Sequence, residues 1–447
     1  MKKKIWLIII LGLIIRLAYL FKHNPIWWDG AVYLGMGKYL FSLGQIGLWE
    51  PLRPLVFPLI LGTFWKLNLN PILFGRILEI FFSLGSVYLV YLIGKTYKNE
   101  FVGLIAATLL CFTPIFFDFS FRLYTEIPST FFALLAIYLF MKKNLSLSAI
   151  FCALAFLTKF PQGLVLLTLG LFSFKKIKDT IKFGTIFLIS ILPYLIFNYL
   201  KYNSIFQPLI DGNYIIKNAG VWIFIKPWWY YFSEILNQNI LYIFAVIGII
   251  LTLKYKHKYI PIIFTLIFIY FTRLAHKEPR FIILFLPYLA IFAAIGINSI
   301  FKKKWVYWIV LGISLVILIL NINVFPDQYQ GRENFFNYLN DKEINNTIIV
   351  SHPYIGINKD VKSLPMYYMV FNSELADYWL NYINENYKEI DYIFFDTCEG
   401  GTICPPTDEK CKQKQEELIT LSKTLFEVKL EETRGNCRYF IFSQEYR

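Results

Sequence analysis

The chain has 447 residues, of which 57% are hydrophobic and 17% are charged, and its formal net charge is +14. A mean hydropathy of +0.51 is too apolar for an ordinary soluble protein of this length. These values exclude a soluble globular chain and predict a membrane protein.

Apolar runs of 16 to 22 residues recur from the N-terminus to about residue 325, each long enough to cross a hydrocarbon layer as a helix. We predict about eleven crossings by that rule. The first run, IWLIIILGLIIRLAYLF, follows three lysines as in a signal peptide, but it lacks a small-residue cleavage site and contains Arg16. We therefore interpret it as a retained first helix of a polytopic α-helical membrane protein.

Lysine clusters predict the orientation, because short loops rich in Lys and Arg stay in the cytoplasm. With the N-terminus in the cytoplasm, the clusters between residues 95 and 304 all fall on the cytoplasmic face. Seven of the ten acidic residues before residue 326 fall on the other face: Asp29, Glu50, Asp118, Glu126, Asp211, Glu234 and Glu278. We therefore expect the chemistry on the non-cytoplasmic side.

The first external segment, residues 22 to about 70, contains the stretch WWDGAVYLGMGKYLFSLG. Its apolar spacing predicts an amphipathic helix that lies along the membrane surface. Asp29 precedes that helix, so it is either an N-cap or a functional acid. The following stretch, WEPLRPLVFPLILG, contains Arg53 and three prolines, which favour a broken, re-entrant path.

A second group of charges occurs in FFDFSFRLYTEIPSTFF, between two predicted crossings. Asp118, Arg122 and Glu126 recur every fourth residue, so on a helix they would share one face and pair. A solvated loop of self-neutralising charges is the alternative. Lys159, in ALAFLTKFPQG, is either part of the same external site or a snorkelling lysine.

The stretch HKEPRF, residues 276–281, places four ionisable side chains between two apolar runs. Pro279 suits the first turn of the following helix, so Lys277 and Arg280 would lie near a helix N-terminus. Such a place binds anionic groups, and a phosphate is the hypothesis we favour. A Lys–Glu–Arg ion-pair cluster that caps two helices is the alternative.

Residues 326–447 differ from the rest in charge and pattern. They hold 13 Lys and Arg against 20 Asp and Glu, a balance of −7, which leaves +21 for the membrane part. The basic charge thus follows the topology and does not indicate nucleic-acid binding. Strand-like pieces such as NTIIVS, DYIFFD and CRYFIFS alternate with helix-like ones, so we expect a small α/β domain outside the cytoplasm.

Cysteine usage agrees with that compartment. Two of the six cysteines lie in apolar runs, and the other four are Cys398, Cys404, Cys411 and Cys437 in the tail. An even number in a short segment predicts disulfides in an oxidising environment, with the pairing left open. A zinc site is the alternative, although the spacing lacks paired C-x2-C knuckles.

The stretch HKEPRF resembles the HKExRF motif of the mannosyltransferases that build lipid-linked oligosaccharides and GPI anchors. The acid after the first helix and the stretches RPLVFP, TEIPSTFF and ALAFLTKFPQG are similar to the wider GT-C superfamily, including protein-O-mannosyltransferase-like enzymes. The resemblance covers residues 1–325. It implies an integral membrane glycosyltransferase that moves a hexose, with a leaning towards mannose, from a polyprenyl- or dolichyl-phosphate carrier to a hydroxyl acceptor outside the cytoplasm, with inversion.

By that resemblance Asp29 matches the acid proposed to deprotonate the acceptor hydroxyl, whereas Gly30 stands where many relatives have a second acid. The residues themselves suggest further roles, because the departing lipid phosphate needs its charge neutralised. We expect that neutralisation from His276, Lys277, Arg280 and Arg122. We expect Asp118, Glu126 and Glu278 to orient the acceptor or to hold a divalent cation such as Mg or Mn, with Arg53 and Lys159 as further site residues.

The acceptor class, which is a glycan, a glycolipid or a protein, stays open at this stage. The alternative to an enzyme is a polytopic protein that binds lipid-linked sugars or moves them as a flippase does, without transferase activity. The sequence shows no inverted repeat of interrupted helices, which disfavours a transporter.

Overall fold

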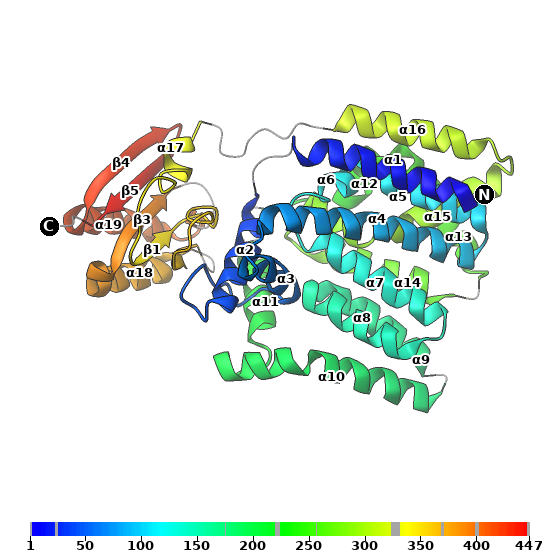
Figure 1. Cartoon of the computed structure of the whole chain (residues 1–447), viewed down its shortest axis with the longest axis horizontal. Coiled ribbons are helices and arrows are strands. Elements are labelled where there is room, and N and C mark those ends of the chain that lie inside the picture. Colours follow the sequence, from blue (N-terminus) through cyan, green and yellow to red (C-terminus); the bar gives the residue numbers. More distant parts are fainter. Residues whose placement is uncertain are drawn as a thin grey trace.

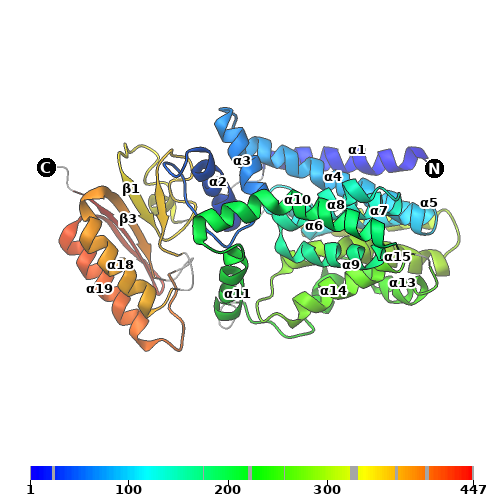
Figure 2. The same ribbon diagram turned by 90° about the horizontal axis from the view of Figure 1, so that it is seen from below.

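The computed structural model describes residues 2–22, 26–174, 176–219, 224–255, 257–322, 331–367, 371–397 and 402–444. The molecule is elongated (Figure 1), with a bundle of helices at one end and a small domain with a sheet at the other. Figure 2 shows the same division from a second side, with α2, α3 and α11 near the junction. The predicted helical body with a C-terminal α/β domain is therefore confirmed in outline.

The helical body contains α-helices and short 3-10 turns. In chain order they are α1 (Lys2–Leu20), α2 (Trp28–Phe41), α3 (Val56–Lys66), α4 (Pro71–Tyr97), α5 (Glu100–Cys111), α6 (Pro114–Asp118), α7 (Glu126–Met141), α8 (Leu145–Thr158), η1 (Phe160–Gln162), α9 (Gly163–Ser173), α10 (Ile177–Tyr202), α11 (Gln207–Ala219), α12 (Tyr230–Gln238), η2 (Ile240–Phe244), α13 (Ala245–Thr252), α14 (Tyr259–Arg273), η3 (Pro279–Leu284), α15 (Leu286–Ile300) and α16 (Val306–Asn321).

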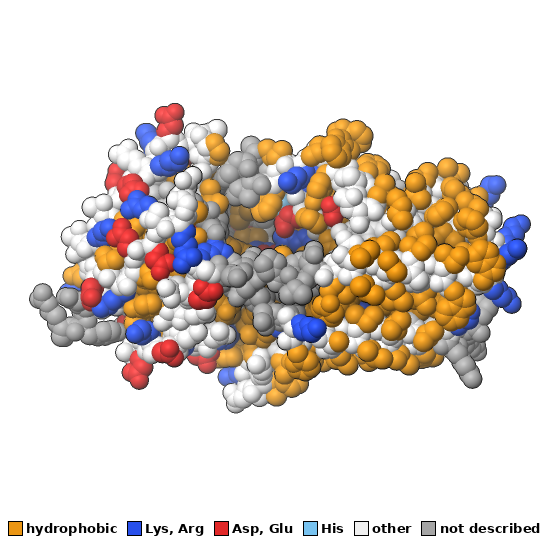
Figure 3. All heavy atoms as spheres, turned by 90° about the horizontal axis from the view of Figure 1, so that it is seen from above, with side chains coloured by type: hydrophobic (Ala, Val, Ile, Leu, Met, Phe, Trp, Pro, Cys, Tyr) orange, Lys and Arg blue, Asp and Glu red, His pale blue; other side chains and the backbone are white. Residues whose placement is uncertain are grey.

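The surface of this body is that of a membrane protein. Two helices, α4 with 27 residues and α10 with 26, are long and apolar enough to cross a membrane, and shorter apolar helices have 10–17 residues. Only 22% of the apolar window of α10 is buried, so the rest requires an apolar solvent. Apolar side chains cover most of the face of the body that Figure 3 shows, whereas many charged ones lie on the sheet domain and at the far end of the body. The number of crossings, about eleven, stays a prediction.

Helix ends follow local signals in the sequence. The Asn70 side chain accepts hydrogen bonds from the first backbone N–H groups of α4, and Pro71 occupies the first helical position. Asn99 caps α5 in the same way. The cap at Asn70 fixes where the first external segment ends, and the cap at Asn99 lies beyond the opposite end of α4.

The C-terminal domain is built on a five-stranded sheet of order β2-β1-β3-β5-β4. Its elements are α17 (Glu333–Phe336), β1 (Thr347–Val350), β2 (Ser363–Pro365), α18 (Ser373–Asn386), η4 (Tyr387–Glu389), β3 (Ile390–Asp396), α19 (Glu409–Leu425), β4 (Glu427–Arg434) and β5 (Cys437–Ser443). Strand β1 pairs in parallel with β2 and β3, and β5 pairs antiparallel with β3 and β4.

Side chains of β3 alternate between two cores, as successive strand residues must. Ile393 and Phe395 belong to the core under α18 and α19, whereas Tyr392 and Phe394 pack with α17 on the other face. The second core also contacts Trp28 of α2. The sheet domain therefore shares packing with the first external segment.

Helix α2 was predicted to be amphipathic and to lie along the membrane surface; the amphipathic part is wrong, and the position relative to the membrane stays a prediction. Its residues from Asp29 to Lys38 are all buried. Helix α3 covers one side so closely that a Cβ at Gly37 would lie 2.6 Å from the carbonyl oxygen of Pro58. The sheet domain covers another side, because Trp28 packs edge-on against His352 and Tyr367.

Lys38 fastens the first external segment to the sheet domain. Its Nζ donates to the carbonyls of Ile357 and Lys359 at 2.9 and 3.1 Å and to Asp360 at 3.0 Å. Gly47 adds a parallel bridge to Lys362. These contacts join the first external segment to the sheet domain.

Cys404 and Cys411 form a disulfide, and Cys437 is also disulfide-bonded. Cys398 lies outside the described residues. Cys111 and Cys152 are buried free thiols in the helical body, as the apolar runs indicated.

Candidate active site

Asp29 lies in the first turn of α2, near the boundary between the helical body and the sheet domain. The N-cap position is held by Trp27, whose side chain makes no capping bond, so Asp29 is not the N-cap. Its carboxylate instead accepts hydrogen bonds from Arg53, at 2.9 Å, and from Arg280. Only 8% of its side chain is exposed, so two cations face one buried carboxylate.

Arg53 comes from the proline-rich stretch between α2 and α3. Its Nη2 donates to Asp29 and its Nε donates to Glu50 at 2.9 Å. The guanidinium also lies over the Tyr33 ring, 5.5 Å from its centroid. Arg53 therefore joins two acids of the first external segment.

Residues 276–278 of the HKEPRF stretch follow α14 in an extended conformation, and η3 begins at Pro279. His276 forms an isolated bridge with Ile225, and Glu278 has φ −125° and ψ 149°, as expected before a proline. Because alternate residues of an extended chain point to opposite sides, His276 and Glu278 share one side. Glu278 accepts from His276 at 2.7 Å and from Arg280 at 2.6 Å.

Lys277 points to the other side, and the structure does not bring it into this group. Its Nζ donates to the carbonyl of Leu274, and its backbone N–H donates to Phe224 at 3.1 Å. It lines neither of the two cavities described below. The expected phosphate contact from Lys277 therefore has no support in this geometry.

The expected ladder of Asp118, Arg122 and Glu126 is broken in the middle. Helix α6 ends at Asp118 and α7 begins at Glu126, so the three residues do not share one helix. Asp118 pairs with Arg122, whereas Glu126 accepts from Lys159 at 2.9 Å and lies 3.6 Å from Arg280 Nε. The carboxylate of Glu126 therefore lies between Lys159 and Arg280.

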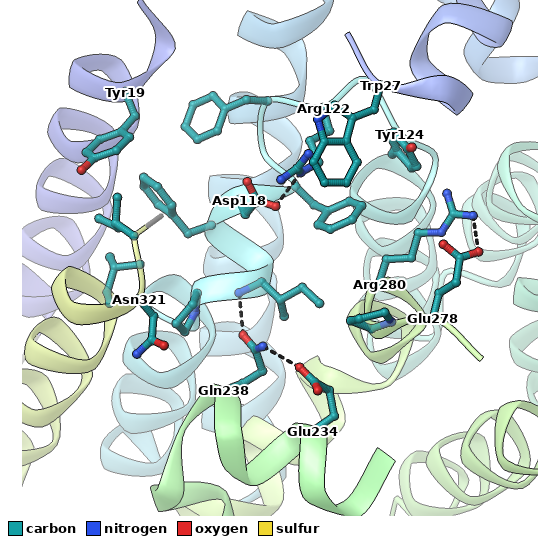
Figure 4. A pocket seen from close by; sticks show the side chains of 18 residues that line it. Tyr19, Trp27, Asp118, Arg122, Tyr124, Glu234, Gln238, Glu278, Arg280 and Asn321 are labelled. Carbon is teal, nitrogen blue, oxygen red and sulfur yellow. Dashed lines mark hydrogen bonds and ion pairs between the residues drawn. The ribbon is translucent and has the colours of Figure 1, made fainter. Parts of the chain in front are cut away.

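Arg122 stacks on Trp27, with its guanidinium carbon 3.2 Å from the ring centroid. Its Nε donates to Asp118 at 2.5 Å. Figure 4 shows Asp118, Arg122 and Arg280 around one pocket. Asp29 lines a different one, which contains neither Asp118 nor Arg122.

Two cavities meet at this site. The larger has a volume of about 770 Å³ and includes Asp29, Arg53, Lys159 and His276 in its lining. The smaller has a volume of about 430 Å³ and includes Asp118 and Arg122. Among the described residues, those that line both cavities are Trp27, Tyr124, Glu278 and Arg280. We call these four residues the dividing wall.

Burial and neighbouring charge shift the pKa values of the acids near the wall in opposite directions. Burial alone raises the pKa of Asp29, but the guanidiniums of Arg280 and Arg53 outweigh it and hold the pKa well below its ordinary value. Burial raises the pKa of Glu50 despite Arg53. Asp29 is therefore an ionised carboxylate over the whole physiological range.

The predicted metal ligands do not form a joint set. Asp118 pairs with Arg122, Glu126 pairs with Lys159, and Glu278 pairs with Arg280, so each carboxylate already faces a cation. In the part of the chain that the structure describes, no group of three or more His, Cys, Asp or Glu side chains gathers in a metal-binding arrangement. We therefore derive no step through a metal ion.

Sequence reasoning missed several lining residues. Trp27 and Tyr124 belong to the wall, and Tyr367 and Phe371 reach the larger cavity from the sheet domain. Glu79 of α4 was also missed, and it accepts from the backbone N–H groups of Leu123 and Tyr124 at 2.7 and 2.8 Å. The signal that could have identified Glu79 is its position as a single acid within an apolar run.

Comparison with known proteins follows the same outline. The family model described as "Alg9-like mannosyltransferase family" matches residues 5–370. No curated protein sequence matches this chain. Among solved structures, ArnT from Cupriavidus metallidurans bound to undecaprenyl phosphate superposes with a TM-score of 0.71 at 10% identity, covering 98% of both chains.

A second solved structure is the archaeal oligosaccharyltransferase AglB from Archaeoglobus fulgidus, in complex with an inhibitory peptide and a dolichol-phosphate. It superposes with a TM-score of 0.54 at 10% identity and covers 99% of this chain and 74% of that one. At such identities the likeness concerns the fold. The resemblance to GT-C glycosyltransferases that the motifs indicated is confirmed.

Proposed function

This chain belongs to the Alg9-like mannosyltransferase family, and from that premise we propose that it transfers a hexose, namely mannose, from a polyprenyl- or dolichyl-phosphate carrier to a hydroxyl acceptor on the non-cytoplasmic face. The observation that carries the proposal is the buried carboxylate of Asp29 between Arg53 and Arg280, at the place where two cavities share a wall.

The arrangement supplies both halves of a glycosyl transfer. The acceptor oxygen forms a bond to the anomeric carbon while its proton passes to Asp29, and the bond from that carbon to the phosphate oxygen breaks. The lipid phosphate leaves with the electron pair, and the guanidinium of Arg280 neutralises its charge. Attack from the side opposite to the leaving phosphate inverts the anomeric centre.

The same arginines tune the base. With two guanidiniums on its carboxylate, Asp29 is a weak base at the start of the reaction. As charge develops on the leaving phosphate, Arg280 is shared with it, so the proton affinity of Asp29 rises when the proton has to be taken. Glu278 and Glu126 hold Arg280 in place between the carboxylate of Asp29 and the phosphate of the carrier.

The larger cavity suits a lipid carrier. It runs from the polar wall to apolar side chains of α11 and α14, including Leu209, Ile216 and Phe271. ArnT, whose fold this chain shares, was solved with undecaprenyl phosphate, and AglB was solved with a dolichol-phosphate. These observations support a polyprenyl phosphate as the carrier.

The proposed orientation puts the N-terminus in the cytoplasm and the sheet domain outside it. The lysine clusters support this orientation. The disulfide between Cys404 and Cys411 supports an oxidising compartment for the sheet domain. We accordingly divide the chain into a membrane-embedded catalytic domain, residues 1–325, and an extracytoplasmic domain, residues 326–447.

The decisive experiment is transfer of radiolabelled sugar from polyprenyl- and dolichyl-phosphate mannose, and from the glucose analogues, to total membrane lipid and protein. Purified wild type, Asp29→Asn and the control Asp341→Asn, which changes an exposed acid of the sheet domain, are compared side by side. We expect transfer from a mannose donor by wild type and control, and loss of transfer in Asp29→Asn.

The labelled pool identifies the acceptor as a glycan, a glycolipid or a protein. Transfer that survives in Asp29→Asn contradicts the base assignment. Absence of transfer by folded wild type, combined with tight binding of the donor, favours the alternative of a lipid-linked-sugar binding or flippase-type protein.

A further inference from the structure

The chain between α6 and α7, residues 119–125, forms an irregular turn, which we call the α6–α7 turn. Leu123 in this turn has φ +59°, in the left-handed region that residues with a side chain seldom adopt. Such a conformation persists only where neighbouring groups hold it in place. The α6–α7 turn therefore needs support from another element.

Helix α4 supplies that support through two side chains. Arg76 and Glu79 are three residues apart, so they are neighbours on one face of the helix. The Nε of Arg76 donates to the carbonyl of Phe121 at 3.1 Å. The two carboxylate oxygens of Glu79 accept from the backbone N–H groups of Leu123 and Tyr124, at 2.7 and 2.8 Å. Glu79 thus fixes the backbone at the left-handed residue and at the residue after it.

The chemistry of the turn explains why an acid occupies position 79. Glu79 is fully buried and lines neither of the two cavities, so it does not touch a substrate held in them. A carboxylate only accepts hydrogen bonds and offers one oxygen to each N–H. A glutamine of the same shape has one acceptor oxygen, and its NH₂ group would face a backbone donor. One buried N–H would then lose its partner, which is costly.

The α6–α7 turn contacts both members of the ion pair between Asp29 and Arg280. The guanidinium carbon of Arg280 lies 4.9 Å from the centroid of the Tyr124 ring, within cation–π range. The carbonyl of Arg122 packs against the residue after Asp29, because a Cβ at Gly30 would lie 2.7 Å from that oxygen. A small shift of the turn therefore acts on the arginine and on the backbone that carries the acid.

From these contacts we infer that Glu79 is a positioning residue of the reaction: it holds the α6–α7 turn so that Tyr124 keeps Arg280 aligned on Asp29. The inference rests on the proposed function and goes beyond it, because it gives a role in turnover to a residue outside the site. A misplacement of about 1 Å caused far from the reacting atoms can cost about 10²-fold in rate. Loss of Glu79 should therefore lower kcat and leave substrate binding nearly unchanged.

Glu79→Gln tests the inference, since it exchanges one acceptor for a donor at constant shape. We expect kcat for transfer from polyprenyl-phosphate mannose to fall by about 10–100-fold, and both KM values to stay within about twofold. The matched control is Glu100→Gln, which changes an acid in the first turn of α5 that accepts from Tyr91 at 3.2 Å, beyond the opposite end of α4. It should leave kcat unchanged. An unchanged kcat in folded Glu79→Gln overturns the inference.

A variant that keeps both acceptor oxygens covers the case in which Glu79→Gln does not fold. Glu79→Asp shortens the side chain by one methylene, so the two bonds to the turn are stretched and kcat should fall in the same direction by a smaller factor. Equal kcat in Glu79→Asp and wild type, with Glu79→Gln unfolded, would assign Glu79 to folding alone and overturn the inference.

A double-mutant cycle separates positioning from general support. Tyr124→Leu removes the ring on which Arg280 lies, so Glu79→Gln added to it should lower kcat by less than about threefold more. Tyr124→Phe keeps the ring, and in that background Glu79→Gln should keep its full effect. If the losses from Glu79→Gln and Tyr124→Leu multiply in full, Glu79 does not act through Tyr124 and the inference is overturned.

Hydrogen–deuterium exchange of the full-length protein in nanodiscs tests the same route without turnover. In Glu79→Gln we expect faster exchange than in wild type at residues 119–126 and also at residues 27–33 and 276–284, with no change in β4 and β5. Faster exchange at residues 119–126 alone, or throughout the chain, overturns the inference. Failure of transfer by wild type to every acceptor counts against the proposed function, and the exchange pattern still decides whether Glu79 acts on the site.

Discussion

Two carboxylate–arginine groups border the dividing wall, and they differ in the number of cations. Asp29 has 8% of its side chain exposed and faces two arginines, whereas Asp118 has 12% exposed and pairs with Arg122. Burial raises the pKa of both, yet the pKa of Asp29 ends well below its ordinary value and that of Asp118 is raised to about 6. At similar burial, the second guanidinium decides the direction of the shift.

The largest expected effect separates these two acids directly. Asp29→Asn removes the base, so kcat should fall by about 10²–10⁴-fold, the usual contribution of a positioned base. Asp118→Asn keeps a side chain of the same shape that touches no reacting atom, so kcat should fall less than about tenfold. Initial rates at saturating substrates measure both. A larger loss in Asp118→Asn than in Asp29→Asn would reverse the roles.

A second test removes one of the two cations from Asp29. Arg280→Gln should lower kcat by about 10²–10³-fold, because the leaving phosphate loses a preorganised donor. The pKa of Asp29 should rise, since burial then faces a single guanidinium. Below that raised pKa the carboxyl is protonated and inactive as a base, so the residual rate of the variant should fall with acid.

The measurement is kcat between pH 4.5 and 8 for wild type and for Arg280→Gln. Wild type should show no loss in this range from Asp29, because its carboxylate stays ionised. Arg280→Lys serves as the matched control, since it keeps the charge and loses the planar fork. If kcat fell at the same acidic pH in wild type and in Arg280→Gln, Arg280 would not be lowering the pKa of Asp29.

The third test uses the raised pKa of Asp118, which is about 6. Below that pH the carboxyl is neutral, its ion pair with Arg122 is lost, and the smaller cavity gains positive charge. The KM of the substrate that this cavity holds should therefore rise a few-fold as the pH falls from 7 to 5, while the KM of the other substrate stays constant. Asp118→Asn should abolish this dependence, and its persistence in the variant would assign the titration to another group.

The sequence predicted that Asp29, Arg280 and Glu278 lie on the same side of the membrane, because their segments alternate sides in a regular way. That Arg280 contacts both acids is known only from the structure. The pattern also predicted the alternating strands of the sheet domain. The direction of each side chain was harder to predict. Lys277 lies between His276 and Glu278 in an extended chain, so its side chain points to the opposite side from theirs.

Contacts between distant segments account for the other misses. Helix α2 reads as amphipathic, but Trp28 packs against Tyr367, more than 300 residues away, so both of its sides are buried. Periodicity reports that a face is apolar and does not say which element covers it. Tyr124 carries no charge and no motif, and its place in the dividing wall follows from the backbone bonds of Glu79.

The smallest expected effect on turnover comes from a third charged group, that of Lys38, which touches neither cavity. Lys38→Met keeps the length of the side chain and removes its bonds to Asp360 and to the two carbonyls of the sheet domain. The loss should lower the free energy of unfolding by about 1–3 kcal/mol, because the carbonyl groups of Ile357 and Lys359 lose their hydrogen-bond donor. Asp360 is 57% exposed, so its ion pair adds little to this figure. The specific activity of the folded fraction should match wild type, since Asp29 keeps Arg53 and Arg280. A fall in kcat without a fall in melting temperature would show that the docking of the sheet domain sets the geometry of the dividing wall. Lys38 would then act on the site and not only on stability.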